Sequence, residues 1–173
     1  MLDQVREALA AFAQCRTTPA LIGGLALTAH EVVRATQDID FLADAADAET
    51  LDGLLRGLGY KCVHRSDDAA NYRRGDEGID FLFAHRPVAL RLLAEASERE
   101  TSAGRLRVVS AEGLIGFKLQ AYVNNPSREQ DIVDIRSLLR AKRGALNMDE
   151  VREYFRLFQR KELLDELIAD LEK

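Results

Sequence analysis

The chain has few of the residues that mark disulfide-rich or membrane-spanning proteins. It contains two cysteines, three prolines and no tryptophan among 173 residues. Two cysteines are too few for a disulfide framework or a cysteine metal site, so we expect free thiols in a reducing compartment. No apolar run approaches the roughly 20 residues of a membrane helix, and the first residues lack the apolar centre of a signal peptide. We therefore expect a cytoplasmic protein with no membrane partner.

Basic residues are outnumbered by acidic ones, with 24 Lys and Arg against 29 Asp and Glu. The formal net charge is −5, and aromatic residues make up only 6% of the chain without interleaving with a basic patch. Broad, phosphate-driven nucleic-acid binding is therefore not expected. The composition of 47% hydrophobic and 31% charged residues is ordinary for a globular protein. The length suits one well-cored domain with a small helical appendix.

The stretch Ala20 to Leu42 organises the rest of the chain. It is predicted to form a short strand, the turn Gly23-Gly24, a short helix and a second strand that opens with Asp38-Ile39-Asp40. Alternate side chains of a strand share a face, so Asp38 and Asp40 point the same way, about 7 Å apart. A divalent cation such as Mg²⁺ is a natural counter-charge for them. The glycine turn is either a phosphate-binding turn or a simple tight turn.

These residues resemble a known family. Gly-Gly, thirteen intervening residues and Asp-x-Asp resemble the signature of the nucleotidyltransferase fold of the DNA polymerase β type. The fuller pattern GGLALTAH…RATQDIDF is similar to the AbiEii-like branch of bacterial nucleotidyltransferases and toxins. The close resemblance covers Ala20 to Leu42 and continues more loosely to about Leu139. It implies an α/β (α+β) fold: a mixed sheet flanked by helices, with a catalytic core over 1–109 and a helical portion over 110–173 that flank one cleft.

A third aspartate lies in the next apolar strand. Residues 78–84 are apolar and aromatic, as in a central strand, yet contain Asp80. Asp80 matches the third carboxylate of the family, although a capping aspartate at a strand edge is the alternative. Before it, Asn71 to Arg74 form a possible further strand, and the charged stretch Arg73 to Glu77 is predicted to be a solvated, hairpin-like turn. Arg34, in the loop before Asp38, either helps to neutralise the site and bind phosphate or is a solvated loop arginine.

A lysine in an apolar setting is the second anomaly. A helix capped by Ser110 is predicted to run to about residue 123, and Lys118 lies among its apolar residues. The polar face of this helix is predicted to hold Glu112, Gly116 and Gln120. The next helix is predicted to begin with a capping box of Ser127 and Gln130. Asp131 is placed at the edge of its apolar face, where it meets Lys118, and Asp134 lies one step further out. The resemblance implies that Lys118 reaches the phosphates of a nucleotide; a structural ion pair with Asp131 is equally consistent.

The resemblance implies an enzyme that transfers a nucleoside monophosphate from an NTP to an acceptor hydroxyl. Asp38, Asp40 and Asp80 would hold Mg²⁺ (or Mn²⁺), with Asp80 also accepting the proton of the acceptor. Lys118 would offset developing charge. The expected nucleotide-binding residues are Gly23, Gly24, Arg34, Lys118 and Asp131. The acceptor stays open among a small molecule, a tRNA end and a protein hydroxyl, and a toxin–antitoxin role with an antitoxin partner is a family-level expectation.

Two other functions are consistent with parts of the pattern. One is a binding module on the same fold, a nucleotide sensor or an antitoxin-like partner without turnover, which the intact set of three aspartates disfavours. The other is a phosphatase of the haloacid dehalogenase type, which also uses Asp-x-Asp. That type leaves the upstream glycine pair unexplained, and Phe41-Leu42 follow the aspartates where it usually has a threonine or valine two places on.

Overall fold

The computed structural model describes residues 2–101 and 104–171, so the tip of the hairpin after Thr101 lies outside the described residues. The chain divides into two compact units. The first comprises Met1–Ala29 and Arg34–Val109, and the second comprises His30–Val33 and Ser110–Lys173. No helix in the described part of the chain is long and apolar enough to cross a membrane.

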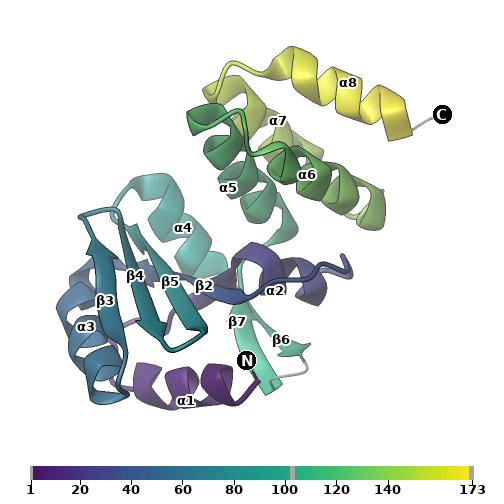
Figure 1. The fold of residues 1–173 in the computed structure, drawn as a ribbon. Coiled ribbons are helices and arrows are strands. Elements are labelled where there is room, and N and C mark those ends of the chain that lie inside the picture. Colours follow the sequence, from purple (N-terminus) through teal and green to yellow (C-terminus); the bar gives the residue numbers. More distant parts are fainter. Residues whose placement is uncertain (1, 102–103, 172–173) are drawn as a thin grey trace. The chain divides into compact units, whose positions relative to one another are not determined.

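The first unit is built on one mixed sheet (Figure 1). Its strands are β1 (Ala20–Ile22), β2 (Asp38–Asp44), β3 (Lys61–Arg65), β4 (Ala69–Arg74), β5 (Glu77–Ala84), β6 (Ser97–Thr101) and β7 (Gly104–Val108). They form one seven-stranded sheet in the order β3-β4-β5-β2-β1-β7-β6. The central pair β2 and β5 is parallel, whereas β1 runs antiparallel to β2.

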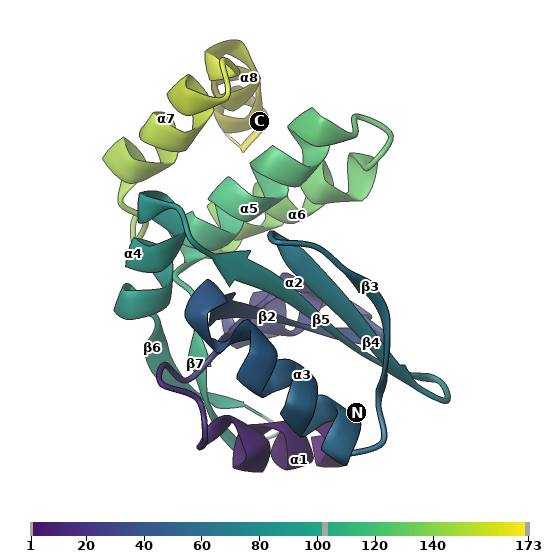
Figure 2. The ribbon, with the colours of Figure 1, turned by 90° about the vertical axis from the view of Figure 1, so that its left-hand side faces the viewer.

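Helices cover both faces of this sheet. They are α1 (Leu2–Phe12), α2 (Gly23–Ala29), α3 (Ala48–Gly57) and α4 (Pro87–Glu95), with a 3-10 turn at Ala45–Asp47. Helices α1 and α3 lie on one face and α2 lies on the other (Figure 2). The Phe12 ring of α1 packs edge-on against Phe41 of β2, with 4.9 Å between ring centroids, and also contacts Phe81 of β5.

The alternation of β2 decides which face of the sheet is apolar. Ile39 and Phe41 are buried, and Phe41 packs against Phe12 of α1. The intervening Asp38 and Asp40 are only partly buried and belong to the opposite face. One strand therefore supplies both a core layer and a row of carboxylates.

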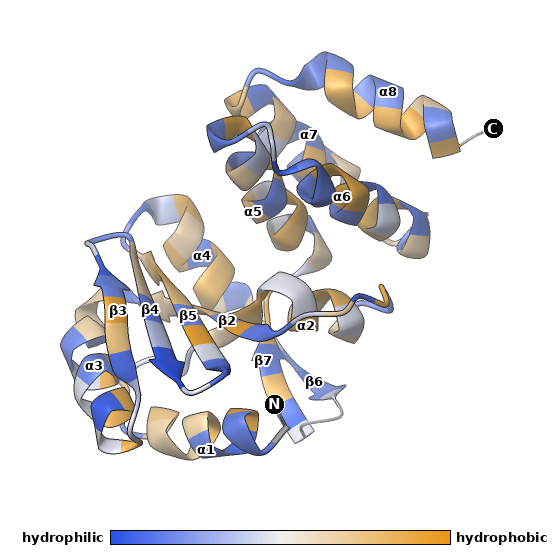
Figure 3. Ribbon diagram, in the orientation of Figure 1, coloured by the Kyte–Doolittle hydropathy of each residue, from blue (hydrophilic) through white to orange (hydrophobic). Residues whose placement is uncertain are grey.

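The second unit is helical. It contains α5 (Ala111–Asn124), α6 (Glu129–Ala141), α7 (Met148–Leu157) and α8 (Lys161–Leu171). Helix α5 packs against α6 and α7, and α8 packs against α7 and α6. Apolar and polar residues alternate along α8, as a helix with one buried face requires (Figure 3). The predicted mixed α/β fold with a C-terminal helical portion is confirmed.

Two local predictions about these helices need correction. Gly116, predicted on a polar face, is buried, and a Cβ there would come within 3.2 Å of the Tyr154 ring of α7. The glycine therefore permits a close helix crossing. Ser127 does not cap α6: its hydroxyl donates to Asn125 Oδ1 at 2.6 Å, and the residue preceding the helix is Arg128. The predicted Ser110 cap of α5 is confirmed, because its Oγ accepts from the Gly113 amide at 3.1 Å.

Candidate active site

Three carboxylates lie on one face of the central strand pair. In the parallel pairing of β2 with β5, Asp40 is opposite Asp80 and Asp38 is opposite Gly78. Neighbouring strands are about 4.8 Å apart, so Asp40 and Asp80 are side by side. The alternation within β2 adds Asp38 to the same face. The structure therefore brings together the three aspartates that the sequence singled out.

The glycine turn after β1 lies against these carboxylates. Ile22, the last residue of β1, pairs with Asp40, and Gly23 follows with φ +66°. A Cβ on Gly23 would overlap the Asp40 carboxylate, and one on Gly24 would lie 2.7 Å from the Thr36 Cβ. Glycine is thus required at both positions, by a positive φ at the first and by close packing at both. The turn holds the backbone close to Asp40.

An arginine that the sequence analysis assigned to a solvated turn belongs to this site. Arg73 is part of strand β4, and its Nη1 donates to Asp80 Oδ1 at 2.6 Å. Its Nη2 lies 3.8 Å from Asp38 Oδ1. The hydrogen bond to Asp80 is the main cause of a raised pKa of the Arg73 guanidinium, to which the charges of the three aspartates add. The alternation from Asn71 to Arg73 beside the short turn at Gly75 was the signal that could have placed Arg73 on this face.

The site is open to solvent. The side chains of Asp38, Arg73 and Asp80 are 46%, 36% and 22% exposed. The residues fit a hard cation in kind, because all three are carboxylates and they already attract the charge of Arg73. As the side chains lie, however, no group of three or more His, Cys, Asp or Glu residues in the described ranges is arranged to hold a metal ion. The metal-binding role of Asp38, Asp40 and Asp80 therefore stays a prediction.

Arg34 is the first residue of the second segment of the first unit, which follows α2. It is half-buried and lies in the loop that leads to β2. This loop is tied to the strand by Thr36, whose hydroxyl donates to the Asp38 carbonyl at 3.0 Å. A role for Arg34 in neutralising the site or binding phosphate stays a prediction.

Lys118 and Asp131, the other predicted site residues, lie in the second unit. Lys118 Nζ is 2.9 Å from Asp131 Oδ1 and 2.9 Å from Asp134 Oδ2. The side chain of Lys118 is 11% exposed and those of the two aspartates are 3% exposed. The predicted contact between Lys118 and Asp131 is confirmed. Asp134 is an equal partner that the sequence analysis placed further out, although its i, i+3 spacing from Asp131 puts both on one side of α6.

Further donors complete this buried cluster. Arg128 Nε donates to Asp131 Oδ2 at 2.7 Å, and Gln130 Nε2 donates to Asp134 Oδ1 at 3.1 Å. Burial raises the pKa of Asp131, but the hydrogen bonds from Arg128 and Lys118 outweigh it and hold that pKa below its ordinary value. Asp131 is therefore a carboxylate at neutral pH, held in a network of hydrogen bonds and ion pairs inside the helical unit.

Solved nucleotidyltransferase structures share the fold of this chain. The solution structure of the antibiotic-resistance factor ANT(2″)-Ia matches it with a TM-score of 0.68 and 19% identity, covering 98% of this chain and 96% of that chain. A crystal structure of ANT(2″)-Ia in complex with adenylyl-2″-tobramycin also gives 0.68 and 19%, over 91% and 96% of the two chains. Lincomycin-bound LnuA, a lincosamide antibiotic adenylyltransferase, matches with a TM-score of 0.57 and 18% identity, over 79% and 94%.

These matches define the class of fold. The chain has the nucleotidyltransferase fold, as the Gly-Gly and Asp-x-Asp pattern predicted. No protein-family model matches the chain, and no curated protein sequence does either.

Proposed function

We propose that this chain is a metal-dependent nucleotidyltransferase that moves a nucleoside monophosphate from an NTP to an acceptor hydroxyl. The observation that carries the proposal is the register of Asp40 with Asp80, with Asp38 on the same face. The same face meets the Gly23 turn, which is shaped around the Asp40 carboxylate. A carboxylate set beside a close-approaching backbone turn suits a substrate made of phosphates and a cation.

Each residue has a proposed role in this reaction. Asp38, Asp40 and Asp80 would hold Mg²⁺ or Mn²⁺, which when bound supplies charge stabilisation to the phosphoryl oxygens. Asp80 would also accept the proton of the acceptor hydroxyl, because its side chain is partly exposed beside the other two carboxylates. The amides of Gly23 and Gly24 would face the phosphates of the NTP, and Arg34 would add positive charge.

A nucleotide-binding role for Lys118 and Asp131 competes with a structural role for the same side chains. The ammonium of Lys118 already contacts two buried carboxylates, and Asp131 also accepts from Arg128. These contacts support a structural role, in which the cluster holds α5 against α6. A phosphate-binding role for Lys118 requires that it change partners, and the Asp131 variant described below tests this.

For the acceptor we propose the hydroxyl of a small molecule. The support is that ANT(2″)-Ia and LnuA, whose fold this chain shares over nearly their full length, are described as an antibiotic-resistance factor and an antibiotic adenylyltransferase. The sequence pattern of the AbiEii-like branch supports a different acceptor, a tRNA end or a protein, within a toxin–antitoxin pair. The acceptor class is therefore the first thing to measure.

A nucleotide-binding module without turnover is the second candidate. The observation in its favour is the ion pair of Arg73 with Asp80. This ion pair occupies the carboxylate that the proposed reaction would use to accept a proton. In this case the purified chain would bind NTP and leave it unchanged.

The test follows label from each of the four α-³²P NTPs. The purified chain is incubated with Mg²⁺ and a lysate fractionated into small molecules, RNA and protein, beside an Asp38→Ala, Asp40→Ala double variant. Label in one fraction that depends on the two aspartates supports transfer and identifies the acceptor class. NTP binding without transfer supports the binding module. Absence of both transfer and NTP binding overturns the proposal and leaves only a shared fold.

A further inference from the structure

We propose that Arg73 is a positioning residue that acts as a tethered counter-cation. Its guanidinium occupies the carboxylate set when no divalent cation is bound and is displaced when one binds, so that Arg73 sets the affinity of the site for the cation. This inference rests on the proposed function, because it concerns the same three aspartates. It adds a residue and a regulatory step to that site.

The geometry shows how Arg73 reaches the carboxylates. On the sheet, Gly78 of β5 lies between Arg73 of β4 and Asp38 of β2, in register with both. A Cβ on Gly78 would overlap Asp38 Oδ1 and lie 2.9 Å from Arg73 Nη1. The absence of a side chain at this position leaves a passage over β5. The guanidinium lies in it and contacts both Asp80 and Asp38.

The contacts of Arg73 are suited to exchange. The Nη1 atom of Arg73 donates both to Asp80 Oδ1 at 2.6 Å and to the Tyr72 carbonyl at 2.9 Å. The contacts of Nη2 are longer, at 3.5 Å to Asp80 and 3.8 Å to Asp38. The pair is part-exposed, so water can replace each contact. A divalent ion has twice the charge of the guanidinium and is a stronger partner for several carboxylate oxygens.

Arg73 cannot leave the site by losing its proton. A guanidinium stays charged at all physiological pH values. The carboxylates are therefore released only when the side chain moves. One positive charge against three aspartates also leaves a surplus of negative charge, which continues to attract a cation.

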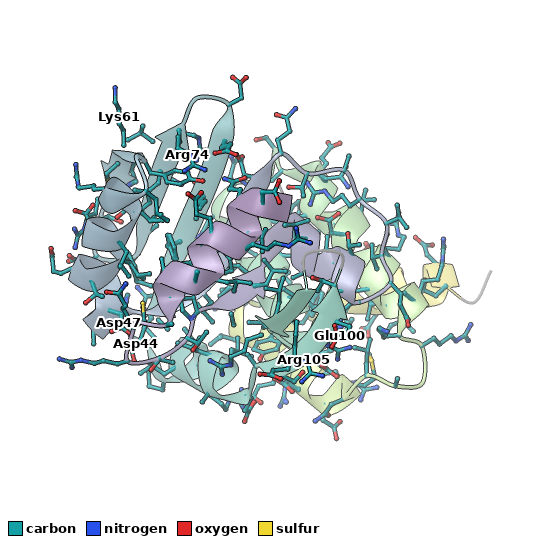
Figure 4. All side chains as sticks on the ribbon, turned by 90° about the horizontal axis from the view of Figure 1, so that it is seen from below. Asp44, Asp47, Lys61, Arg74, Glu100 and Arg105 are labelled. Atoms are coloured by element: carbon teal, nitrogen blue, oxygen red, sulfur yellow. The ribbon has the colours of Figure 1, made fainter. Side chains whose placement is uncertain are left out.

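Binding of Mn²⁺ in the absence of nucleotide and acceptor tests the inference. Free Mn²⁺ is measured by electron paramagnetic resonance for the wild type and for Arg73→Gln. Removing the competitor is expected to tighten Mn²⁺ binding by about three- to tenfold. The matched control is Arg105→Gln, which makes the same charge change. Arg105 is on β7 and pairs with the exposed Glu100 at 3.0 Å, beside it in Figure 4, so we expect its Mn²⁺ affinity to equal that of the wild type.

Further variants distinguish loss of the Arg73 contacts from a folding defect. Arg73→Lys keeps the charge but has a single nitrogen, which cannot span Asp38 and Asp80 together, and is expected to bind Mn²⁺ with an affinity between those of the wild type and Arg73→Gln. Adding Asp80→Asn to either variant is expected to remove the gain. Circular dichroism shows which variants are folded.

Two results overturn the inference. The first is a folded Arg73 variant with wild-type Mn²⁺ affinity, and the second is no Mn²⁺ binding by any variant. Tighter binding in Arg73→Gln without nucleotidyl transfer supports the inference and argues against the proposed function, so the two failures are distinct.

Discussion

The two units each contain a cation held between two aspartates, and the two clusters differ in burial. In the first unit Arg73 contacts Asp38 and Asp80 on an open face of the sheet. In the second unit Lys118 contacts Asp131 and Asp134, which are almost fully buried between α5 and α6. The same kind of charge arrangement is thus exchangeable with solvent in one place and enclosed in the other.

Burial determines what each cluster can do. An exposed ion pair contributes little to folding, so its groups are available to bind a ligand. A buried pair is costly to break, because removing one partner leaves an unpaired charge away from water. The comparison supports the proposed chemistry at Asp38, Asp40 and Asp80 and a structural role for Lys118. The predictions below test this division, from the largest expected effect to the smallest.

Removing the buried lysine is expected to have the largest effect. Lys118→Met leaves Asp131 and Asp134 without their shared ammonium, so the free energy of unfolding should fall by about 3–5 kcal/mol. Urea unfolding followed by circular dichroism measures this. The matched control is Lys142→Met, which removes a less enclosed pair with Glu31 and should cost less than about 1 kcal/mol. Equal costs for the two variants would contradict the division.

Removing one carboxylate of the partly exposed set is expected to affect activity and to leave folding intact. Asp40→Asn should lower the rate of nucleotidyl transfer by about 10²- to 10³-fold, because the site loses charge where phosphate and cation are proposed to bind. The control is Asp44→Asn, which makes the same substitution at the other end of β2. There the Asp44 carboxylate accepts a hydrogen bond from the Ala46 amide. Labelled-nucleotide transfer measures both variants. Similar activity in the two would show that position within β2 does not matter.

A methyl group at the glycine turn is expected to have a smaller effect. Gly23→Ala combines a positive φ with overlap on Asp40, so it should destabilise the chain by about 1–3 kcal/mol and weaken NTP binding. Gly53→Ala is the control, since Gly53 lies in α3 with open space around it. It should stabilise the chain by about 0.5–1 kcal/mol. Thermal unfolding of both variants measures the opposite signs, and a stable Gly23→Ala chain would refute the proposed shape of the turn.

Acid should weaken the buried cluster. Because the pKa of folded Asp131 lies below its unfolded value of about 3.9, its ion pairs stabilise the fold above that pH. This stabilisation is lost as the pH falls through the folded pKa. Urea unfolding between about pH 2 and 6 should show a steeper decline for the wild type than for Asp131→Asn. Parallel declines would mean that Asp131 has the same pKa in both states.

Much of the sheet and of the site could be predicted from local patterns. The alternation of Asp38, Ile39 and Asp40 gave the correct face for both aspartates, and the apolar run around Asp80 gave a central strand. The register that places Asp80 opposite Asp40 could not be predicted from local patterns. It depends on a parallel pairing between strands that are separated by two other strands along the chain.

The residues that were missed depend on packing. Arg73 was counted both in a possible strand and in a solvated turn, because residues 73–77 are all charged or glycine, whereas its place on the sheet follows from β4 pairing with β5. Gly116 was assigned to a polar face by its helical position, and the ring of Tyr154 from another helix buries it. Neither strand β5 beside Arg73 nor the Tyr154 ring beside Gly116 can be inferred from local sequence spacing.

The division between the clusters is tested most directly by a matched pair of variants, Asp80→Asn and Asp131→Asn. For each, Mg·ATP binding is measured by isothermal titration calorimetry and stability by urea unfolding. We predict that Asp80→Asn weakens ATP binding by about tenfold or more with little change in stability, and that Asp131→Asn mainly lowers stability. A folded and stable Asp131→Asn chain that no longer binds ATP, beside an Asp80→Asn chain that still does, would contradict the account.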